Sequence, residues 1–261
     1  MSAEKESLIE LRGVRLHFKE KEVLNGVNLS VRSQETQVIM GVSGCGKSTL
    51  LSIMLGLLIP DAGSVQFKNE DMTQLSRQAL NQARMKIGMV YQNAALLSSL
   101  TIGENVALPL RELTHQSTRE IDAIIEEKLE LVGLAEAKDE LPSELSGGMQ
   151  KRAGMARALA MNPELILFDE PTAGLDPISS DLINELIIKL RDQQKVTSII
   201  VTHEMESAFA LATRMAFLDG GKIILEGTPD EFRNSDIPLV IKFLASQSVH
   251  KITKDPINAD S

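Results

Sequence analysis

The stretch Gly41-Val-Ser-Gly-Cys-Gly-Lys-Ser-Thr49 decides the fold of this 261-residue chain. It matches the phosphate-loop pattern G-x-x-x-x-G-K-[ST], with Gly41 and Gly46 as the bracketing glycines. Glycines allow backbone N–H groups to curl around phosphate oxygens, where a Cβ would collide. Lys47 adds a positive charge, and the hydroxyl of Ser48 can bind Mg²⁺. The stretch therefore predicts a site for a nucleoside triphosphate with Mg²⁺.

The residues on either side of the loop favour a strand–loop–helix arrangement. Val38-Ile39-Met40 is a short apolar run typical of a buried strand, and Leu50–Leu58 has the composition of an apolar helix. Such a helix points the positive end of its dipole at the bound phosphates. A glycine-rich turn without a ligand is the alternative, but it does not explain the order of strand, loop, lysine, hydroxyl and helix.

The composition limits the class of protein. A net charge of −9 argues against nucleic acid as a partner, since nucleic-acid binding normally needs a basic surface. The single Cys45 cannot form an internal disulfide, which suits a reducing compartment, and we interpret it as a space filler rather than a reactive thiol. The longest apolar run, Leu50–Ile59, is about half of the roughly 20 residues that span a bilayer. The polar start, Met1–Ser7, lacks the apolar core of a signal peptide. We therefore expect a cytoplasmic protein that reaches a membrane only through a partner.

The order of the predicted elements indicates an α/β fold. Apolar residues alternate with period two between Leu8 and Val31, which predicts antiparallel strands with turns at Gly13 and Asn25-Gly26. Further along, short buried strands alternate with helices, which indicates a parallel sheet covered on both faces. The stretch from Thr101 to about Ala160 is helical and charged.

A second group of candidate site residues follows two predicted strands. Leu165–Phe168 is an apolar strand that ends in Asp169 and Glu170. Asp169 is placed to hold Mg²⁺ opposite Ser48, and Glu170 to accept a proton from an attacking water. His203 closes the next strand at the same sheet edge, where ligands bind in parallel α/β sheets, so we expect it to contact the γ-phosphate.

The stretch Leu145-Ser-Gly-Gly-Met-Gln150 predicts a second anion site. Two glycines after a hydroxyl residue, at the start of a helix, offer backbone N–H groups much as the phosphate loop does. One nucleotide already has its phosphates held by the loop. We infer that Ser146, Gly147 and Gly148 serve a nucleotide bound to another copy of the chain.

Together these motifs resemble the ATP-binding-cassette (ABC) ATPases. The match rests on motifs in the family's order over about residues 8–228: the phosphate loop, Gln92, the LSGGM run at 145–149, Asp169-Glu170, the run Ala173-Gly174-Leu175-Asp176, and His203. The resemblance implies a P-loop NTPase fold with a RecA-like parallel sheet core, an N-terminal antiparallel β subdomain and an inserted helical subdomain at about 93–161. It also implies ATP hydrolysis coupled to transport, by two copies stacked head to tail on a transmembrane permease at the cytoplasmic face of the inner membrane.

The resemblance also implies a role for each matched residue. Phe18, which on its own we would place in the sheet, matches the aromatic that stacks on adenine. Gln92 matches the Mg²⁺-sensing loop that couples to the permease, and Asp176 matches the residue that links the two sites of the dimer. Glu170 matches the general base and His203 matches the switch histidine. Together with Lys47 they form the implied catalytic set. The implied nucleotide-binding set is Phe18, Gly41, Val42, Ser43, Gly44, Cys45, Gly46, Lys47, Ser48, Thr49, Gln92, Ser146, Gly147, Gly148, Met149 and Asp176, and the metal set is Ser48, Gln92 and Asp169.

Longer stretches resemble one branch of the family. Pro142–Arg152, Ala94–Leu96 and Glu104–Arg111 are similar to the ATPases of the Mla/Mce phospholipid transport systems, which implies a substrate-binding Mce-type protein and a small regulatory subunit as further partners. Met149 departs from the usual glutamine of the family, and its backbone role should survive that change. Similar stretches occur in amino-acid importers and lipoprotein exporters, so those cargoes stay open.

The C-terminal part is predicted as a helical tail at 229–261. Thr228-Pro229 starts a helix with a capping hydroxyl, and the chain loses periodicity from about Ser246, so we expect a loose end there. The apolar residues between Thr228 and Phe243 suggest that the tail docks on the second copy.

Two other functions fit the sequence less well. A soluble ABC ATPase acting on DNA or ribosomes usually carries a coiled-coil insertion or two cassettes in one chain, which this sequence lacks. A small-molecule kinase would leave Ser146–Met149 and His203 without a purpose.

Overall fold

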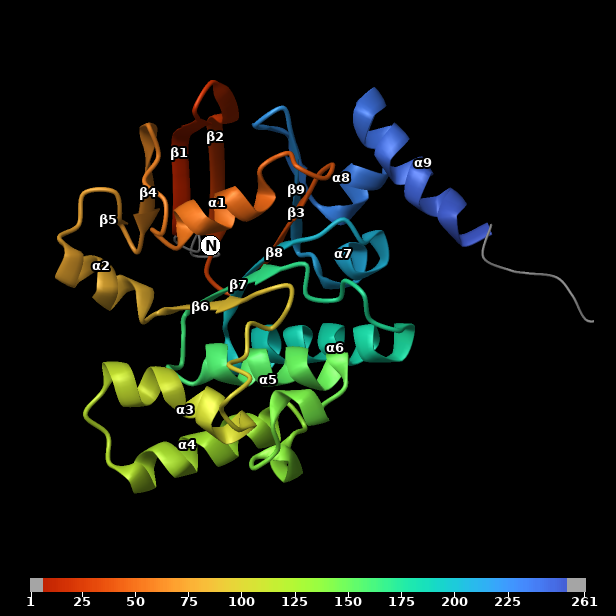
Figure 1. Cartoon of the computed structure of the whole chain (residues 1–261). Helices are drawn as coiled ribbons and strands as arrows, with labels where there is room; N and C mark the ends of the chain where they lie inside the picture. The colour runs from red at the N-terminus through yellow and green to blue at the C-terminus, as the bar shows by residue number, and fades with distance from the viewer. Residues whose placement is uncertain (1–6, 253–261) are drawn as a thin grey trace, which may run out of the picture.

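A six-stranded sheet forms the centre of the molecule in the computed structural model, which describes residues 7–252, with side chains up to Ser246 (Figure 1). The strand order is β10-β9-β3-β8-β7-β6, and every neighbouring pair is parallel except β10 and β9. The strands of this sheet are β3 (Thr36–Met40), β6 (Ile87–Val90), β7 (Leu165–Asp169), β8 (Thr197–Val201), β9 (Arg214–Asp219) and β10 (Lys222–Gly227). This is the parallel core that the sequence predicts.

A second sheet is antiparallel, with the order β2-β1-β4-β5. Its strands are β1 (Ser7–Phe18), β2 (Lys21–Arg32), β4 (Ala62–Phe67) and β5 (Glu70–Asp71). The expected turns at Gly13 and Gly26 were wrong, because both glycines lie inside β1 and β2 where the pairing register shifts. The connection is made by Lys19 and Glu20 instead, and Lys19 has a φ of 55°. Glycine marks bulges as well as turns, so the residue type alone did not separate the two.

The helices fall into groups around the sheets (Figure 1). The bounds are α1 (Lys47–Met54), α2 (Arg77–Arg84), α3 (Ile102–Leu113), α4 (Thr118–Leu131), α5 (Gly147–Leu159), α6 (Pro177–Gln194), α7 (Met205–Leu211), α8 (Pro229–Arg233) and α9 (Pro238–Ile252), with short 3-10 helices η1 (Ala135–Ala137) and η2 (Pro142–Glu144). Between β6 and β7 the chain forms α3, α4 and α5, which gather at one end of the molecule. No helix within residues 7–252 is long and apolar enough to cross a bilayer.

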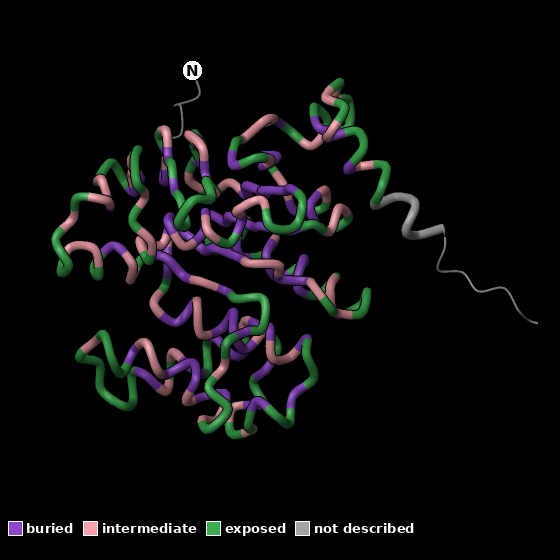
Figure 2. The backbone as a smooth tube through the Cα atoms, turned by 45° about the horizontal axis from the view of Figure 1, so that its top comes forward, coloured by how far each residue is buried: buried purple, intermediate pink, exposed green. Residues whose placement is uncertain are grey.

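Two cores share the central sheet, because successive side chains of a strand point to opposite faces. In β7, Leu165 and Leu167 pack with α1 and the antiparallel sheet. Ile166 and Phe168 pack on the other face with the helical core, which includes residues of α3 to α9. Figure 2 shows this buried band through the middle of the molecule. The central strands read as continuous apolar runs because both of their faces are covered.

The carboxyl ends of the parallel strands meet at one edge and place the site there. In the register, Ile39 of β3 pairs with Val201 of β8, and Val201 pairs with Asp169 of β7. The loops that follow β3, β7 and β8 therefore leave the sheet side by side. This fold is the P-loop NTPase fold expected from the sequence, with its antiparallel sheet and inserted helices.

The C-terminal tail packs on its own chain. Phe232 of α8 and Val240 of α9 are fully buried in the helical core, and the rings of Phe243 and Phe217 pack edge to face with centroids 5.0 Å apart. Most of the apolar surface that suggested docking on a second copy is thus used internally. The loose end expected from about Ser246 was wrong as far as Ile252, because α9 continues to that residue; helical hydrogen bonds are local and can extend past the packed face. Residues 253–261 lie outside the described part.

Phe232→Ala should show how much this tail contributes to stability. Removal of a fully buried phenylalanine is expected to lower the free energy of unfolding by about 3–5 kcal/mol. Ile241→Ala is the matched control on α9, since that side chain is 49% exposed and should change the free energy by less than about 1 kcal/mol. Urea unfolding followed by circular dichroism measures both. Equal midpoints for the two variants would show that the tail does not belong to the core.

Candidate functional site

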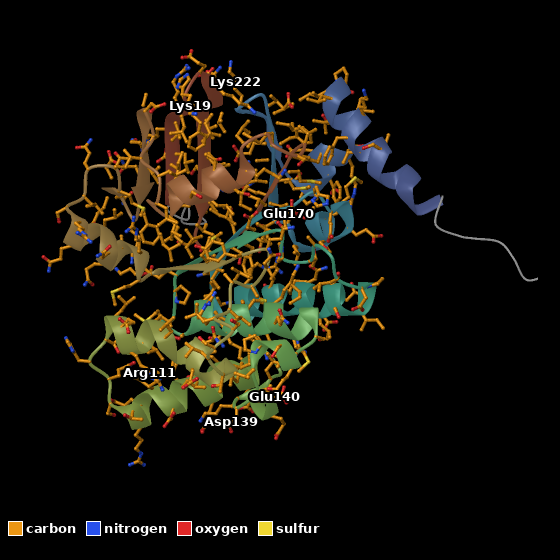
Figure 3. The ribbon with its side chains drawn as sticks, in the orientation of Figure 1. Lys19, Arg111, Asp139, Glu140, Glu170 and Lys222 are labelled. Carbon is orange, nitrogen blue, oxygen red and sulfur yellow. The ribbon has the colours of Figure 1, made fainter. Side chains whose placement is uncertain are left out.

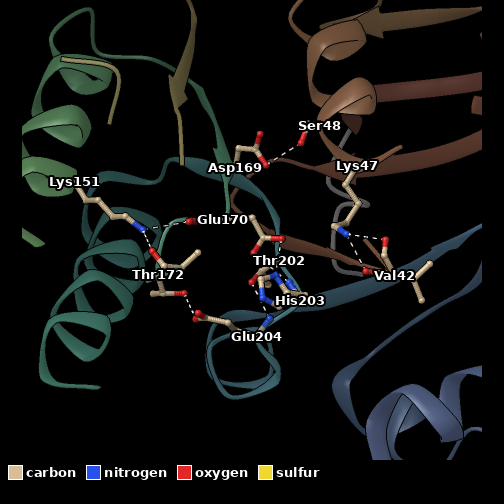
Figure 4. A network of polar contacts seen from close by, with 12 residues as sticks. Val42, Lys47, Ser48, Lys151, Asp169, Glu170, Thr172, Thr202, His203 and Glu204 are labelled. Atoms are coloured by element: carbon tan, nitrogen blue, oxygen red, sulfur yellow. Dashed lines mark hydrogen bonds and ion pairs between the residues drawn. The ribbon is translucent and has the colours of Figure 1, made fainter. Parts of the chain in front are cut away.

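The phosphate loop connects β3 to α1, and its first residue, Gly41, packs closely against the backbone of Leu218. Gly41 follows β3 directly, and a Cβ there would collide with the backbone oxygen of Leu218 and with Sγ of Cys45. Lys47, the first residue of α1, is buried and donates from Nζ to the backbone oxygens of Gly41 at 2.8 Å and Val42 at 3.2 Å (Figure 4). Its ammonium group is therefore held over the loop, beside the start of the helix α1. This combination attracts a phosphate chain.

Ser48 and Asp169 form the candidate metal site. The hydroxyl of Ser48 donates to Oδ1 of Asp169 at 3.2 Å, from α1 to the end of β7 (Figure 4). Burial raises the pKa of Asp169, and the hydrogen bond from Ser48 opposes that rise. Hydroxyl and carboxylate oxygens suit Mg²⁺, which is usually bound by one or two carboxylates together with substrate phosphates. The described residues contain no group of three or more His, Cys, Asp or Glu side chains that could hold a metal ion unaided.

Glu170 and His203 form a pair at the same edge. Oε1 of Glu170 lies 2.9 Å from Nδ1 of His203, and Oε2 accepts the backbone N–H of His203 at 3.2 Å. The Glu170 side chain is only 12% exposed, whereas His203 is 52% exposed on its side chain. Figure 3 places Glu170 near the middle of the molecule, directly after the end of β7. A carboxylate held beside a histidine in this way can accept a proton from water.

These residues line one cleft of about 750 Å³. Its lining consists of Phe18, Val23, Gly41, Val42, Ser43, Gly44, Gly46, Lys47, Ser48, Thr49, Gln92, Asp169, Glu170, His203, Phe243 and Ser246. Cys45 is not among them; its Sγ lies close to Gly41, and burial raises the pKa of its thiol, which fits a space filler. Phe18, the last residue of β1, lines the cleft and is 49% exposed, so part of its ring is accessible to a ligand there.

Three lining residues were not predicted from the sequence. Val23 comes from β2, and Phe243 and Ser246 come from α9. Val23 sits in an ordinary strand pattern. Phe243 lies in a tail whose place in the fold depends on packing with Phe217. No local motif marks them, because tertiary contacts alone bring them to the cleft.

The stretch at the start of α5 lies outside this cleft. Ser146 caps the helix, and its Oγ accepts the N–H of Met149 at 3.3 Å. Ser146 and Gly147 are exposed, and none of Ser146 to Met149 lines the cleft that holds Lys47. The side chain of Met149 packs against the helical core, so the position that departs from the family pattern contributes its backbone to the helix start. The chain thus carries two anion-attracting surfaces that do not meet.

Asp176 also lies apart from the cleft. It caps α6, where its carboxylate accepts the N–H of Ser179 at 3.0 Å and the hydroxyl of Ser179 at 2.6 Å. These bonds lower the pKa of Asp176. Gly148 lies against Ser179 as well, since a Cβ on it would come within 3.0 Å of the serine Oγ. Asp176 is therefore a neighbour of the α5 start within one chain.

The fold and the cleft define a nucleotide hydrolase of the phosphate-loop class. The sequence model described as ABC transporter matches residues 24–173, and the chain belongs to that family. The chain is an ATPase subunit of this family and binds ATP.

Several relatives illustrate the range of the family. The chain is 39% identical to the intermembrane phospholipid transport system ATP-binding protein MlaF of Haemophilus influenzae, over 93% of this chain and 92% of that protein. It is also 39% identical to the methionine import ATP-binding protein MetN 1 of Bacillus cereus, over 95% of this chain and 73% of the relative. Among solved structures, the ATP-binding cassette MJ0796, a dimer in a post-hydrolysis state with ADP and Pi, aligns with a TM-score of 0.78 at 35% identity, covering 85% of this chain and 98% of that one.

Proposed function

We propose that this chain energises phospholipid transport through a membrane permease, acting as a head-to-tail pair at the cytoplasmic face of the membrane. The observation that carries the proposal is the separation of the cleft around Lys47 from the exposed start of α5 at Ser146 and Gly147. One chain offers both halves of a phosphate site but cannot bring them together. A second copy, turned head to tail, completes each cleft with the other chain's α5 start. MJ0796, which shares the fold, has been solved as a dimer.

Within the completed site each residue has a chemical task. Ser48 and Asp169, with Gln92 from the same cleft lining, would hold Mg²⁺, which would neutralise charge on the phosphates. Lys47 binds the phosphates, and Phe18 stacks on the base. Glu170 accepts a proton from the attacking water, and His203, held by Glu170 at 2.9 Å, contacts the γ-phosphate.

A groove on another face suits the permease. It has a volume of about 520 Å³ and lies between α2, β6, α3 and α5. Its lining includes the exposed side chains of Leu113 and Tyr91, at 53% and 40%, and the half-buried Leu108, Pro109 and Met161. An apolar groove with charged residues at its edge accepts an amphipathic helix. Gln92 directly follows Tyr91, so a helix in this groove lies next to a residue of the nucleotide cleft.

Leu113→Glu should separate the chain from its membrane partner. A carboxylate at the edge of this groove would lose its water to the apolar side chains of the docked helix, which weakens the complex by about 3 kcal/mol, more than a hundredfold in affinity. ATP affinity should stay as in the wild type, because Leu113 does not line the nucleotide cleft. Ile59→Glu is the control: Ile59 is 76% exposed and lies outside the groove. Pull-down from solubilised membranes measures the difference, and equal recovery of the permease with both variants would rule the groove out.

The cargo is inferred from the relatives, and it is tested by identifying the proteins and lipids that co-purify with the chain. The phospholipid assignment is supported by MlaF, which aligns over nearly its whole length. MetN 1 is equally identical, which keeps an amino-acid cargo as the second candidate. Purification of the tagged chain from gently solubilised native membranes, followed by mass spectrometry of proteins and lipids, distinguishes them. We expect a multispanning permease, an Mce-type protein, a small regulatory subunit and phospholipid. A permease with a different solute-binding protein would overturn the cargo, and soluble partners or nucleic acid alone would overturn the transporter.

A further inference from the structure

Lys151 is a buried cation that the nucleotide cleft does not use. It lies on α5, only 7% exposed, and its Nζ donates to the backbone oxygen of Ala173 at 2.6 Å and, more weakly, to that of Glu170 at 3.4 Å (Figure 4). A lysine is rarely buried unless its charge is satisfied. Here the ammonium group donates hydrogen bonds to two backbone carbonyl groups of one turn, the turn that follows β7.

That turn carries Glu170 in an unusual backbone conformation. The φ of Glu170 is 48°, in the left-handed region that residues other than glycine seldom adopt. The turn is held by two backbone bonds, from the N–H of Glu170 to the oxygen of Val201 at 2.9 Å and from the N–H of Ala173 to the oxygen of Glu170 at 3.2 Å. The direction of the Glu170 carboxylate follows from this backbone. A group that fixes the two carbonyls therefore fixes where the carboxylate points.

The same turn is anchored from a second direction. Thr172, fully buried, donates from its hydroxyl to Oε2 of Glu204, and the backbone N–H of Glu204 donates to Oγ1 of Thr202 at 3.0 Å (Figure 4). Glu204 is the residue after His203. Burial lowers the pKa of Lys151, while the nearby carboxylates of Glu204 and Glu170 oppose that decrease. The turn is thus clamped between a cation from α5 and an anion from the loop of His203.

We propose that Lys151 is a positioning residue for ATP hydrolysis, which holds the turn 170–173 so that the Glu170 carboxylate keeps its place beside His203. The inference rests on the proposed role of Glu170 as general base. Lys151 stands in the second turn of the helix that starts at Ser146, so it also connects the general base to the surface offered to the second copy. Thr172 and Glu204 form the opposing anchor of the same turn.

Lys151→Met tests this role, with Arg152→Met as the matched control. Arg152 is the next residue on α5 and also donates to two backbone oxygens, those of Val132 at 2.8 Å and Gly133 at 3.0 Å, but its acceptors follow α4 rather than β7. Misplacement of a catalytic group by about 1 Å can reduce the rate about a hundredfold. For Lys151→Met in the full-length chain we expect kcat for MgATP to fall about ten- to a hundredfold, with KM changed less than about threefold. Arg152→Met should keep kcat within about threefold of the wild type. Equal kcat for the two variants would overturn the proposal.

Thr172→Val gives a second route if Lys151→Met does not fold. It removes the hydroxyl that binds Glu204 with little change of shape, and it should lower kcat while leaving KM unchanged. In the double variant the loss should be smaller than the product of the two single losses, because both anchors act on one turn. A loss equal to that product would show that the two anchors act independently and would contradict their action on one shared turn. Glu170→Gln in the same assay separates the two claims: if it hydrolyses ATP normally, the role of Glu170 fails, whereas an inactive Glu170→Gln beside an unaffected Lys151→Met overturns only the positioning.

Discussion

Replacing Glu170 with glutamine is expected to stop ATP turnover while ATP binding persists. Glutamine keeps the size of the side chain and can still bond to His203, but it cannot accept a proton from water at neutral pH. A general base contributes about 10²- to 10⁴-fold to a rate, so hydrolysis should fall at least about a hundredfold. ATP affinity should stay within a few-fold, because the loop residues that bind phosphate are untouched. Phosphate release and equilibrium nucleotide binding measure the two quantities.

Asp181→Asn serves as the control for loss of a carboxylate. Asp181 lies on the exposed side of α6 and outside the cleft, so this variant should hydrolyse ATP at the wild-type rate. Near-normal hydrolysis by Glu170→Gln would remove Glu170 from the chemistry and would direct attention to another base at the same sheet edge.

Replacing Ser146 with arginine should abolish hydrolysis without weakening ATP binding to the chain's own cleft. The substitution removes the hydroxyl that caps α5 and puts a long side chain where the phosphates of the second copy's nucleotide would lie. Loss of a donor to developing negative charge typically reduces kcat about 10²- to 10³-fold. The cleft around Lys47 does not include Ser146, so nucleotide affinity of the single chain should be unchanged.

Ser117→Arg is the matched control for this second variant. Ser117 also caps a helix, α4, and its Oγ accepts the N–H of Glu120 at 3.4 Å. Both substitutions therefore remove one helix cap, worth about 0.5–2 kcal/mol of stability. Only Ser146→Arg should lose hydrolysis. If the two variants turned over ATP at similar rates, the start of α5 would have no part in the reaction.

Much of the fold could be predicted because local patterns and one geometric rule determine it. The apolar runs before Gly41 and Asp169 predict buried strands, and parallel strands bring their carboxyl ends to one edge. The register of Asp169 with Val201 confirms that edge. The position of the first hairpin could not be predicted in the same way, since Gly13 and Gly26 mark bulges inside β1 and β2 rather than turns.

The candidate site was predicted less completely than the fold. Motif residues such as Ser48 and Asp169 lie together as their strands require. The contacts of Lys151 and of Phe243 depend on how distant elements pack, and their own sequences carry no pattern that names a partner. The C-terminal tail could be predicted only in part for the same reason. Its apolar residues can be read from the sequence, but no local pattern indicates whether they pack on their own chain or on a second copy.

The most direct test of the account is the mass of Glu170→Gln in solution with and without MgATP, measured by sedimentation. Because this variant should bind ATP without consuming it, we predict a dimer with MgATP and a monomer without nucleotide. The double variant with Ser146→Arg should stay monomeric in both conditions. If Glu170→Gln saturated with ATP remained a monomer, the completion of each cleft by the α5 start of a second copy would be contradicted.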